Sequence, residues 1–223
     1  MSAPTIRWRP ICTHGCLGGI PEGDIRTTSD GIMVCLHDET PARTTTAPDD
    51  VKDRPVSSFT FEAIRQWDEG VKFSEFFKGE RIPPLKEVFE EMRGSPERLF
   101  YLDLKEVDLQ QLGALIDEYV VHEQVIATHN VQDNCKRMKT IASGVRSMLG
   151  IGGSAERIQE IYLQARQSQF EGLNQIQLHL NNSGQDGDVW PYALEPAFLK
   201  DALADATDEP AKFVQSVRTW RSN

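Results

Sequence analysis

Acidic side chains recur at a spacing of two residues in this sequence. Glu22 and Asp24 flank a glycine in an extended-looking stretch, and Asp103 is followed by Lys105 in the run Tyr-Leu-Asp-Leu-Lys. Residues two apart in a strand project from the same face, so Glu22 and Asp24 can both reach one cation. Three carboxylates with no cysteine or histidine among them favour a hard cation, magnesium or calcium, over zinc. The spacing therefore indicates a divalent metal site.

Each candidate residue also has an ordinary structural explanation. A single Glu or Asp at a strand end is more often solvated or salt-bridged than bound to a metal. His37, taken alone, is more often a hydrogen-bonded histidine of the core or rim than a catalyst, and Asp38 can simply cap the following turn. Only their place in a shared pattern favours a functional role.

Short apolar runs position these side chains. The run from Gly31 to Leu36 is bounded by polar residues and predicts a buried strand whose carboxyl end delivers His37. The polar stretch 40–58 has no period of either kind and predicts a long functional loop. Apolar residues at helical spacing predict helices over 58–68 and 85–94.

Strands and helices alternate through the rest of the chain. Strands are predicted at 99–105, 124–129, 145–150 and 174–180, and helices at 109–120, 134–142, 155–166 and 197–204. This alternation argues for a parallel sheet, either a barrel or an open doubly wound sheet. In a parallel barrel the catalytic groups lie where strands end, at the carboxyl-terminal face. No Gly-x-Gly-x-x-Gly follows a strand, which disfavours dinucleotide binding.

Composition limits the classes of partner. The 223 residues, 39% of them hydrophobic, suit one α/β barrel domain over 1–223. A net charge of −10 excludes nucleic acid as a partner and requires a local positive centre, such as a bound cation, for an anionic substrate. Four cysteines without disulfide spacing, no signal peptide and no membrane span favour a cytoplasmic location.

An ordered series of motifs resembles the glycerophosphodiester phosphodiesterase family of barrel hydrolases. The series consists of Glu22-Gly-Asp24, Thr28-Ser-Asp30-Gly31, Val34-Cys-Leu-His37-Asp38, Arg43-Thr44-Thr45 and the block Gly79-Glu-Arg-Ile-Pro-Pro-Leu85. Asp103-Leu-Lys105 stands where the family usually has Glu-Ile-Lys. Thr207-Asp208-Glu209-Pro210 is similar to the Thr-Asp-x-Pro of the last barrel strand.

The resemblance implies a TIM (β/α)8-type barrel that hydrolyses a small-molecule glycerophosphodiester to glycerol phosphate and an alcohol. Glu22, Asp24 and Asp103 would hold a magnesium or calcium ion. His37 would act as general acid or base, and Lys105 would steady the phosphate. Such roles suit phosphodiester hydrolysis, which needs charge neutralised and protons transferred.

Two family segments are not found in the sequence. The family opens with a strand ending in His-Arg-Gly and a helix before Glu-x-Asp, whereas His14 lies only eight residues before Glu22. His14 is therefore only a candidate for the second catalytic histidine. A strand and a helix are also missing before Thr207. We expect an incomplete barrel with low stability or repair by oligomerisation. A phospholipase D-like enzyme and an inactive barrel kept for binding or left by truncation remain alternatives.

Overall fold

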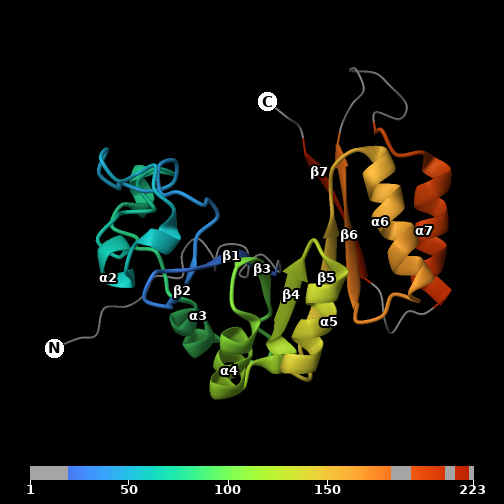
Figure 1. Cartoon of the computed structure of the whole chain (residues 1–223), viewed down its shortest axis with the longest axis horizontal. Coiled ribbons are helices and arrows are strands. Elements are labelled where there is room, and N and C mark those ends of the chain that lie inside the picture. The colour runs from blue at the N-terminus through green and yellow to red at the C-terminus, as the bar shows by residue number, and fades with distance from the viewer. Residues whose placement is uncertain (1–19, 182–191, 209–213, 221–223) are drawn as a thin grey trace. The chain divides into compact units, whose positions relative to one another are not determined.

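The chain forms two compact units, Met1–Ile126 and Ala127–Asn223, in which strands alternate with helices (Figure 1). The structure, a computed structural model, describes residues 20–181, 192–208 and 214–220. Within those ranges no helix is long and apolar enough to cross a membrane.

The first unit contains a small mixed sheet with the order β2-β1-β3. Strand β1 (Glu22–Thr27) pairs antiparallel with β2 (Met33–Cys35) and parallel with β3 (Phe100–Glu106). The turn between β1 and β2 needs a glycine because Gly31 has a φ of 80°. An Asp30 carboxylate oxygen accepts hydrogen bonds from the Thr28 hydroxyl at 2.5 Å and the Phe61 N–H at 2.9 Å. This turn sets the direction in which β2 delivers His37.

The long segment after β2 folds around its own apolar cluster. It contains the short helices η1 (Val56–Ser58), α2 (Phe61–Ile64) and η2 (Glu75–Phe77). The cluster consists of Val34, Leu36, Val56, Phe59, Ile64, Trp67 and Ile82. The rings of Phe59 and Trp67 meet edge to face at 5.1 Å. The predicted helix over 58–68 is therefore shorter than expected, because Asp68 turns into the loop and its N–H donates to the Thr46 hydroxyl at 2.8 Å.

Two helices complete the first unit. Helix α3 (Leu85–Met92) buries Leu85, Val88, Phe89 and Met92 on one face, and α4 (Leu109–Tyr119) begins at the Asp108 cap. The Phe89 and Tyr119 rings lie 6.2 Å apart. The short helix η3 (His122–Gln124) follows. The side-chain amide of Gln124 donates to the carbonyls of Met92, the last residue of α3, and of Ser95 and Arg98 in the connection to β3. Gln124 thereby fixes the approach to β3.

The second unit carries strands in the order β4-β5-β6-β7. Its strands are β4 (Val125–His129), which starts at the end of the first unit, β5 (Arg146–Ile151), β6 (Gln175–Asn181) and β7 (Val214–Trp220). The pairs β5–β6 and β6–β7 are parallel. The helices are α5 (Gln132–Ile141), α6 (Ala155–Gln167) and α7 (Pro196–Asp208). Helices α6 and α7 lie side by side (Figure 1), and the Tyr162 hydroxyl of α6 donates to Asp205 of α7 at 2.8 Å.

The fold class agrees with the prediction. Parallel strand pairs separated by helices confirm the α/β class, and the described residues hold seven strands where a closed barrel of this type has eight. The expectation for Thr207-Asp208 is wrong, because both residues belong to α7 rather than to a strand. No helix breaker precedes Pro210 in that run, so the helix continues. The single domain over 1–223 and oligomerisation stay predictions.

Candidate active site

The register of β1 and β3 brings two predicted metal ligands together. Asp24 is the register partner of Asp103, and Glu22 is the partner of Tyr101 two positions earlier. Register partners in a parallel pair share a face of the sheet, as do residues two apart in one strand. Glu22, Asp24 and Asp103 therefore all belong to one face of this strand pair.

Lys105 lies between two of these carboxylates. Its Nζ is 3.1 Å from Asp24 Oδ1 and 2.7 Å from Asp103 Oδ2. Burial alone lowers the pKa of Lys105, but the hydrogen bonds and charges of Asp103 and Asp24 outweigh it and raise that pKa above its ordinary value. The ammonium group therefore stays charged and balances both carboxylates.

Gly23 allows the carboxylate pair to sit on a closely packed strand. A Cβ at this position would come within 2.7 Å of Cζ of Phe100, whose ring is almost completely buried. Any side chain here would push β1 away from the start of β3. The Glu-Gly-Asp sequence thus combines two outward carboxylates with the small residue that packing requires between them.

His37 is held beside β1 through its backbone. The N–H of Leu36 donates to the Asp24 carbonyl at 2.8 Å, and the Arg26 guanidinium donates to the His37 carbonyl at 3.1 and 3.3 Å. These bonds hold the end of β2 against β1, while the His37 side chain remains 65% exposed. The imidazole is thus positioned by buried backbone and presented to solvent.

Asp38 orients the His37 ring. Nδ1 of His37 lies 2.7 Å from Asp38 Oδ1, and Arg43 donates to both Asp38 oxygens at 2.6 and 2.7 Å. The hydrogen bonds from Arg43, together with the one from His37, hold the pKa of Asp38 below its usual range despite partial burial. An ionised carboxylate only accepts, so Nδ1 of His37 carries the proton. Nε2 is then the nitrogen that can exchange a proton with a bound molecule.

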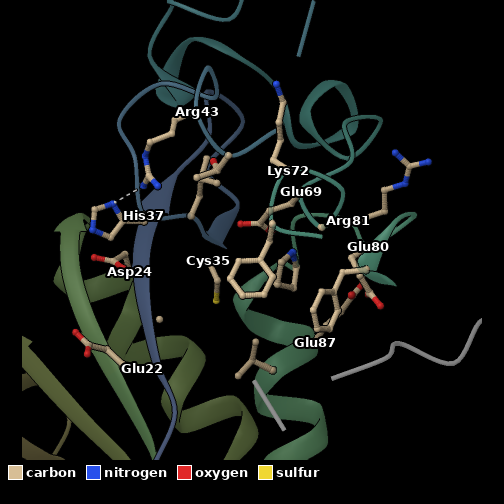
Figure 2. Close-up of a pocket in the computed structure, with 18 residues that line it drawn as sticks. Glu22, Asp24, Cys35, His37, Arg43, Glu69, Lys72, Glu80, Arg81 and Glu87 are labelled. Atoms are coloured by element: carbon tan, nitrogen blue, oxygen red, sulfur yellow. Dashed lines mark hydrogen bonds between the residues drawn. The ribbon is translucent and has the colours of Figure 1, made fainter. Parts of the chain in front are cut away.

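A cavity of about 440 Å³ in the first unit collects these groups. Glu22, Asp24 and His37 line it, whereas Asp103 and Lys105 are absent from its lining and reach it only through Asp24. Figure 2 shows the side chains of Glu22, Asp24 and His37 on one side of strand β1 and the carboxyl group of Glu69 on the other side of that strand. Phe73, Phe77, Pro83 and Val88 add apolar wall. The volume suits a small-molecule ligand.

The three predicted ligands have the right donor chemistry for a hard cation. They supply only oxygen atoms and share one face of β1 and β3. Across the described residues, however, no three Asp, Glu, His or Cys side chains stand close enough to form a metal site as placed. Lys105 forms ion pairs with Asp24 and Asp103 and balances their negative charge. Metal binding by Glu22, Asp24 and Asp103 stays a prediction.

Some site residues went unrecognised in the sequence, and one prediction cannot be located. His14 lies outside the described residues. In the sequence, Asp38 belongs to the His-Asp motif or simply caps a turn, and Arg43 belongs to the Arg-Thr-Thr motif; neither pattern predicts that Asp38 orients His37. Glu69 gave no signal at all, because its burial depends on how the loop around it folds. An acidic residue beside Asp68 and Gly70 in a polar stretch looks like ordinary turn sequence.

A profile of the glycerophosphoryl diester phosphodiesterase family matches residues 21–172. That range covers both the site and most of the alternating strands and helices. The chain belongs to this family. The predicted family is therefore confirmed, and with it the barrel type of the fold.

Other members of the family are similar to this chain over different extents. A glycerophosphodiester phosphodiesterase of Caldanaerobacter subterraneus subsp. tengcongensis is 41% identical over 111 residues, which are 47% of this chain and 43% of that protein. The chain thus matches less than half the length of this relative. A crystal structure of a putative glycerophosphodiester phosphodiesterase from Galdieria sulphuraria aligns with a TM-score of 0.61 at 19% identity, over 89% of this chain and 71% of that one.

An Oleispira antarctica phosphodiesterase solved with its product sn-glycerol-3-phosphate aligns with a TM-score of 0.60 at 18% identity. The alignment covers 91% of this chain and 72% of that structure. At such identity these structures establish the shared fold alone.

Proposed function

We propose that this chain hydrolyses glycerophosphodiesters, such as deacylated phospholipids, to a glycerol phosphate and an alcohol. Family membership supports the reaction class. The glycerol phosphate bound by the Oleispira relative supports the glycerophosphate half of the substrate. The observation that carries the proposal is the oriented imidazole of His37 at a cavity that Glu22 and Asp24 also line.

His37 transfers the proton in this proposal. With Nδ1 donating to Asp38, Nε2 can take a proton from the attacking water molecule or give one to the leaving alcohol. Asp38 keeps the ring in that tautomer, and Arg43 keeps Asp38 ionised. The exposure of the ring leaves Nε2 accessible to a diester in the cavity.

Glu22, Asp24 and Asp103 would hold a divalent cation, magnesium or calcium. Such an ion would neutralise the negative charge that develops on the phosphate oxygens. Lys105 adds a positive charge beside Asp24 and Asp103 and would attract the phosphate. Without such charges the chain, with its net charge of −10, would repel the substrate at long range.

The test is hydrolysis of glycerophosphocholine by the purified chain, followed as choline release with magnesium, calcium or a chelator. We expect activity with a divalent ion, and a loss of about 10² to 10⁴ in kcat for His37→Ala. Glu22→Ala should weaken binding of the metal ion and so raise the metal concentration that activity requires. His122→Ala is the matched control, because this histidine pairs with Asp117 at the end of α4, away from the cavity lining.

A second readout follows the metal without activity. Magnesium or calcium should raise the melting temperature of the wild-type chain and change that of Asp24→Asn less, because only the folded state gathers the carboxylates. Activity that persists in chelator would refute the metal mechanism. A folded but inactive chain would favour the barrel kept for binding, and activity only on acylated phospholipid would favour the phospholipase D-like alternative.

A further inference from the structure

Glu69 is a half-buried acidic group in the cavity that the proposed hydrolysis does not use. It lines the cavity together with Phe73 and Phe77, and its carboxyl group points into the open space (Figure 2). Burial raises the pKa of Glu69 to about 7. Among the described residues no side chain forms a hydrogen bond or ion pair with this carboxyl group. A buried carboxylate without a partner is costly unless a ligand supplies the opposite charge.

The loop holds Glu69 in place from both sides. Its N–H donates to the Glu80 carbonyl at 3.0 Å, and the preceding Asp68 accepts from the N–H groups of Val71 and Gly79 at 3.0 and 2.6 Å. Gly70, the next residue, packs so tightly that a Cβ would lie 2.0 Å from the Phe77 carbonyl oxygen. The backbone is therefore fixed at the point where the Glu69 side chain enters the cavity.

Two aromatic rings line the same cavity as Glu69. Phe73 and Phe77 lie with their ring centroids 5.6 Å apart, and Phe73 is 83% exposed. The face of an aromatic ring attracts a cation, most strongly when water is excluded. A carboxylate and aromatic rings that line one cavity are the chemistry that recognises an ammonium or trimethylammonium group.

The charged groups nearest to Glu69 in the chain do not pair with its carboxyl group, which is therefore available to bind an ammonium group. The Lys72 ammonium and the Arg81 guanidinium both point away from the Glu69 carboxyl group (Figure 2), and Arg81 donates to the Gln66 carbonyl at 2.5 Å. Glu87 is paired with Arg65 at 3.1 Å. The remaining titratable or charged residues of the lining are Glu22, Asp24, Cys35, His37, Arg43 and Glu80.

We propose that Glu69 and the ring of Phe73 bind the cationic alcohol of the substrate, so that the chain prefers glycerophosphodiesters of choline or ethanolamine to those of neutral alcohols. This inference rests on the proposed function and specifies its substrate class. The phosphate end of the diester then faces Asp24 and His37, and the cationic end faces Glu69.

The experiment compares kcat/KM for glycerophosphocholine and glycerophosphoglycerol. We expect the wild type to prefer the choline ester, and Glu69→Gln to lower its kcat/KM about tenfold while the glycerol ester changes little. Phe73→Leu should reduce the same preference a few-fold. The matched controls are Glu75→Gln and Phe76→Leu, exposed residues of the same loop that do not line the cavity.

The pH dependence gives an independent readout. KM for the choline ester should fall as pH rises from 6 to 8 across the pKa of Glu69 near 7, because the ionised carboxylate binds the cation. The ratio to the glycerol ester removes the contributions of His37 and other groups that serve both substrates. Equal losses on both esters in Glu69→Gln, or a preference unchanged by it, would overturn the inference.

A binding measurement separates this inference from the proposed hydrolysis. If neither ester is hydrolysed, calorimetric titration with choline chloride still tests the site. Binding by the wild type that is lost in Glu69→Gln and kept in Glu75→Gln would support the cation site while the hydrolysis fails. Equal binding, or none in any of the three proteins, would refute it.

Discussion

Replacing Glu69 by glutamine should change how the stability of the chain depends on pH. Burial raises the pKa of Glu69 from its ordinary value of 4.5 to about 7 in the folded state. The folded state therefore binds the proton more tightly than the unfolded chain. Stability from this group is highest below pH 4.5 and is lost as pH rises toward 7.

The size of the effect follows from the pKa difference. At about 1.36 kcal/mol per unit, the shift from 4.5 to about 7 limits the cost of ionising Glu69 to roughly 3 kcal/mol above neutral pH. About 2.5 kcal/mol of that cost develops between pH 5 and pH 8. The glutamine side chain has similar size and no charge, so the variant should lack this loss.

Urea unfolding at pH 5 and pH 8 measures the effect. The free energy of unfolding of Glu69→Gln minus that of the wild type should increase by about 2.5 kcal/mol from the lower to the higher pH. Other titrating groups are common to both proteins and cancel. Glu75→Gln, on an exposed side chain, should show no such change. A difference that stays constant within about 0.5 kcal/mol would refute the account of Glu69 as a buried carboxyl group.

Three further substitutions test the site and its support. Gly23→Ala should lower the free energy of unfolding by about 1 to 3 kcal/mol in urea, because the new Cβ meets the buried ring of Phe100 at 2.7 Å. Asp38→Asn should lower kcat on glycerophosphocholine by roughly tenfold or more with little change in KM, because Asp38 no longer enforces the tautomer of His37. An unchanged kcat would refute the orienting role of Asp38. Gln124→Ala should cost about 2 kcal/mol in thermal or urea unfolding, because the hydrogen bonds of this side chain to three backbone carbonyls are lost, and a neutral result would mean that water replaces them.

The alternation of strands and helices was predictable from local pattern. The predicted strand over 99–105 is β3 with one residue of difference at each end, and the helix from Leu85 corresponds to α3. Apolar residues two apart indicate a strand, and apolar residues three and four apart indicate a helix, so each element is encoded within its own segment. The strand expected at Thr207 is wrong because Thr207 and Asp208 continue the helical pattern that begins at Pro196.

The loop between β2 and α3 resisted prediction for a physical reason. Its structure depends on contacts between residues far apart in the sequence, such as the bond from the Asp68 N–H to the Thr46 hydroxyl. Only two short helical turns, η1 and η2, and the four-residue α2 form in it. Such segments have no period that a local reading can detect.

The amino-acid sequence alone was enough to identify the family, the α/β class and the order of the motif residues. Spacing of two along a strand was enough to place Glu22 and Asp24 on one face. The folded structure was needed to show that Lys105 pairs with Asp24 and Asp103, that Asp38 orients His37, and that Glu69 lines the same cavity. These are properties of register, side-chain approach and burial, which arise when separate segments pack together and which no single segment encodes.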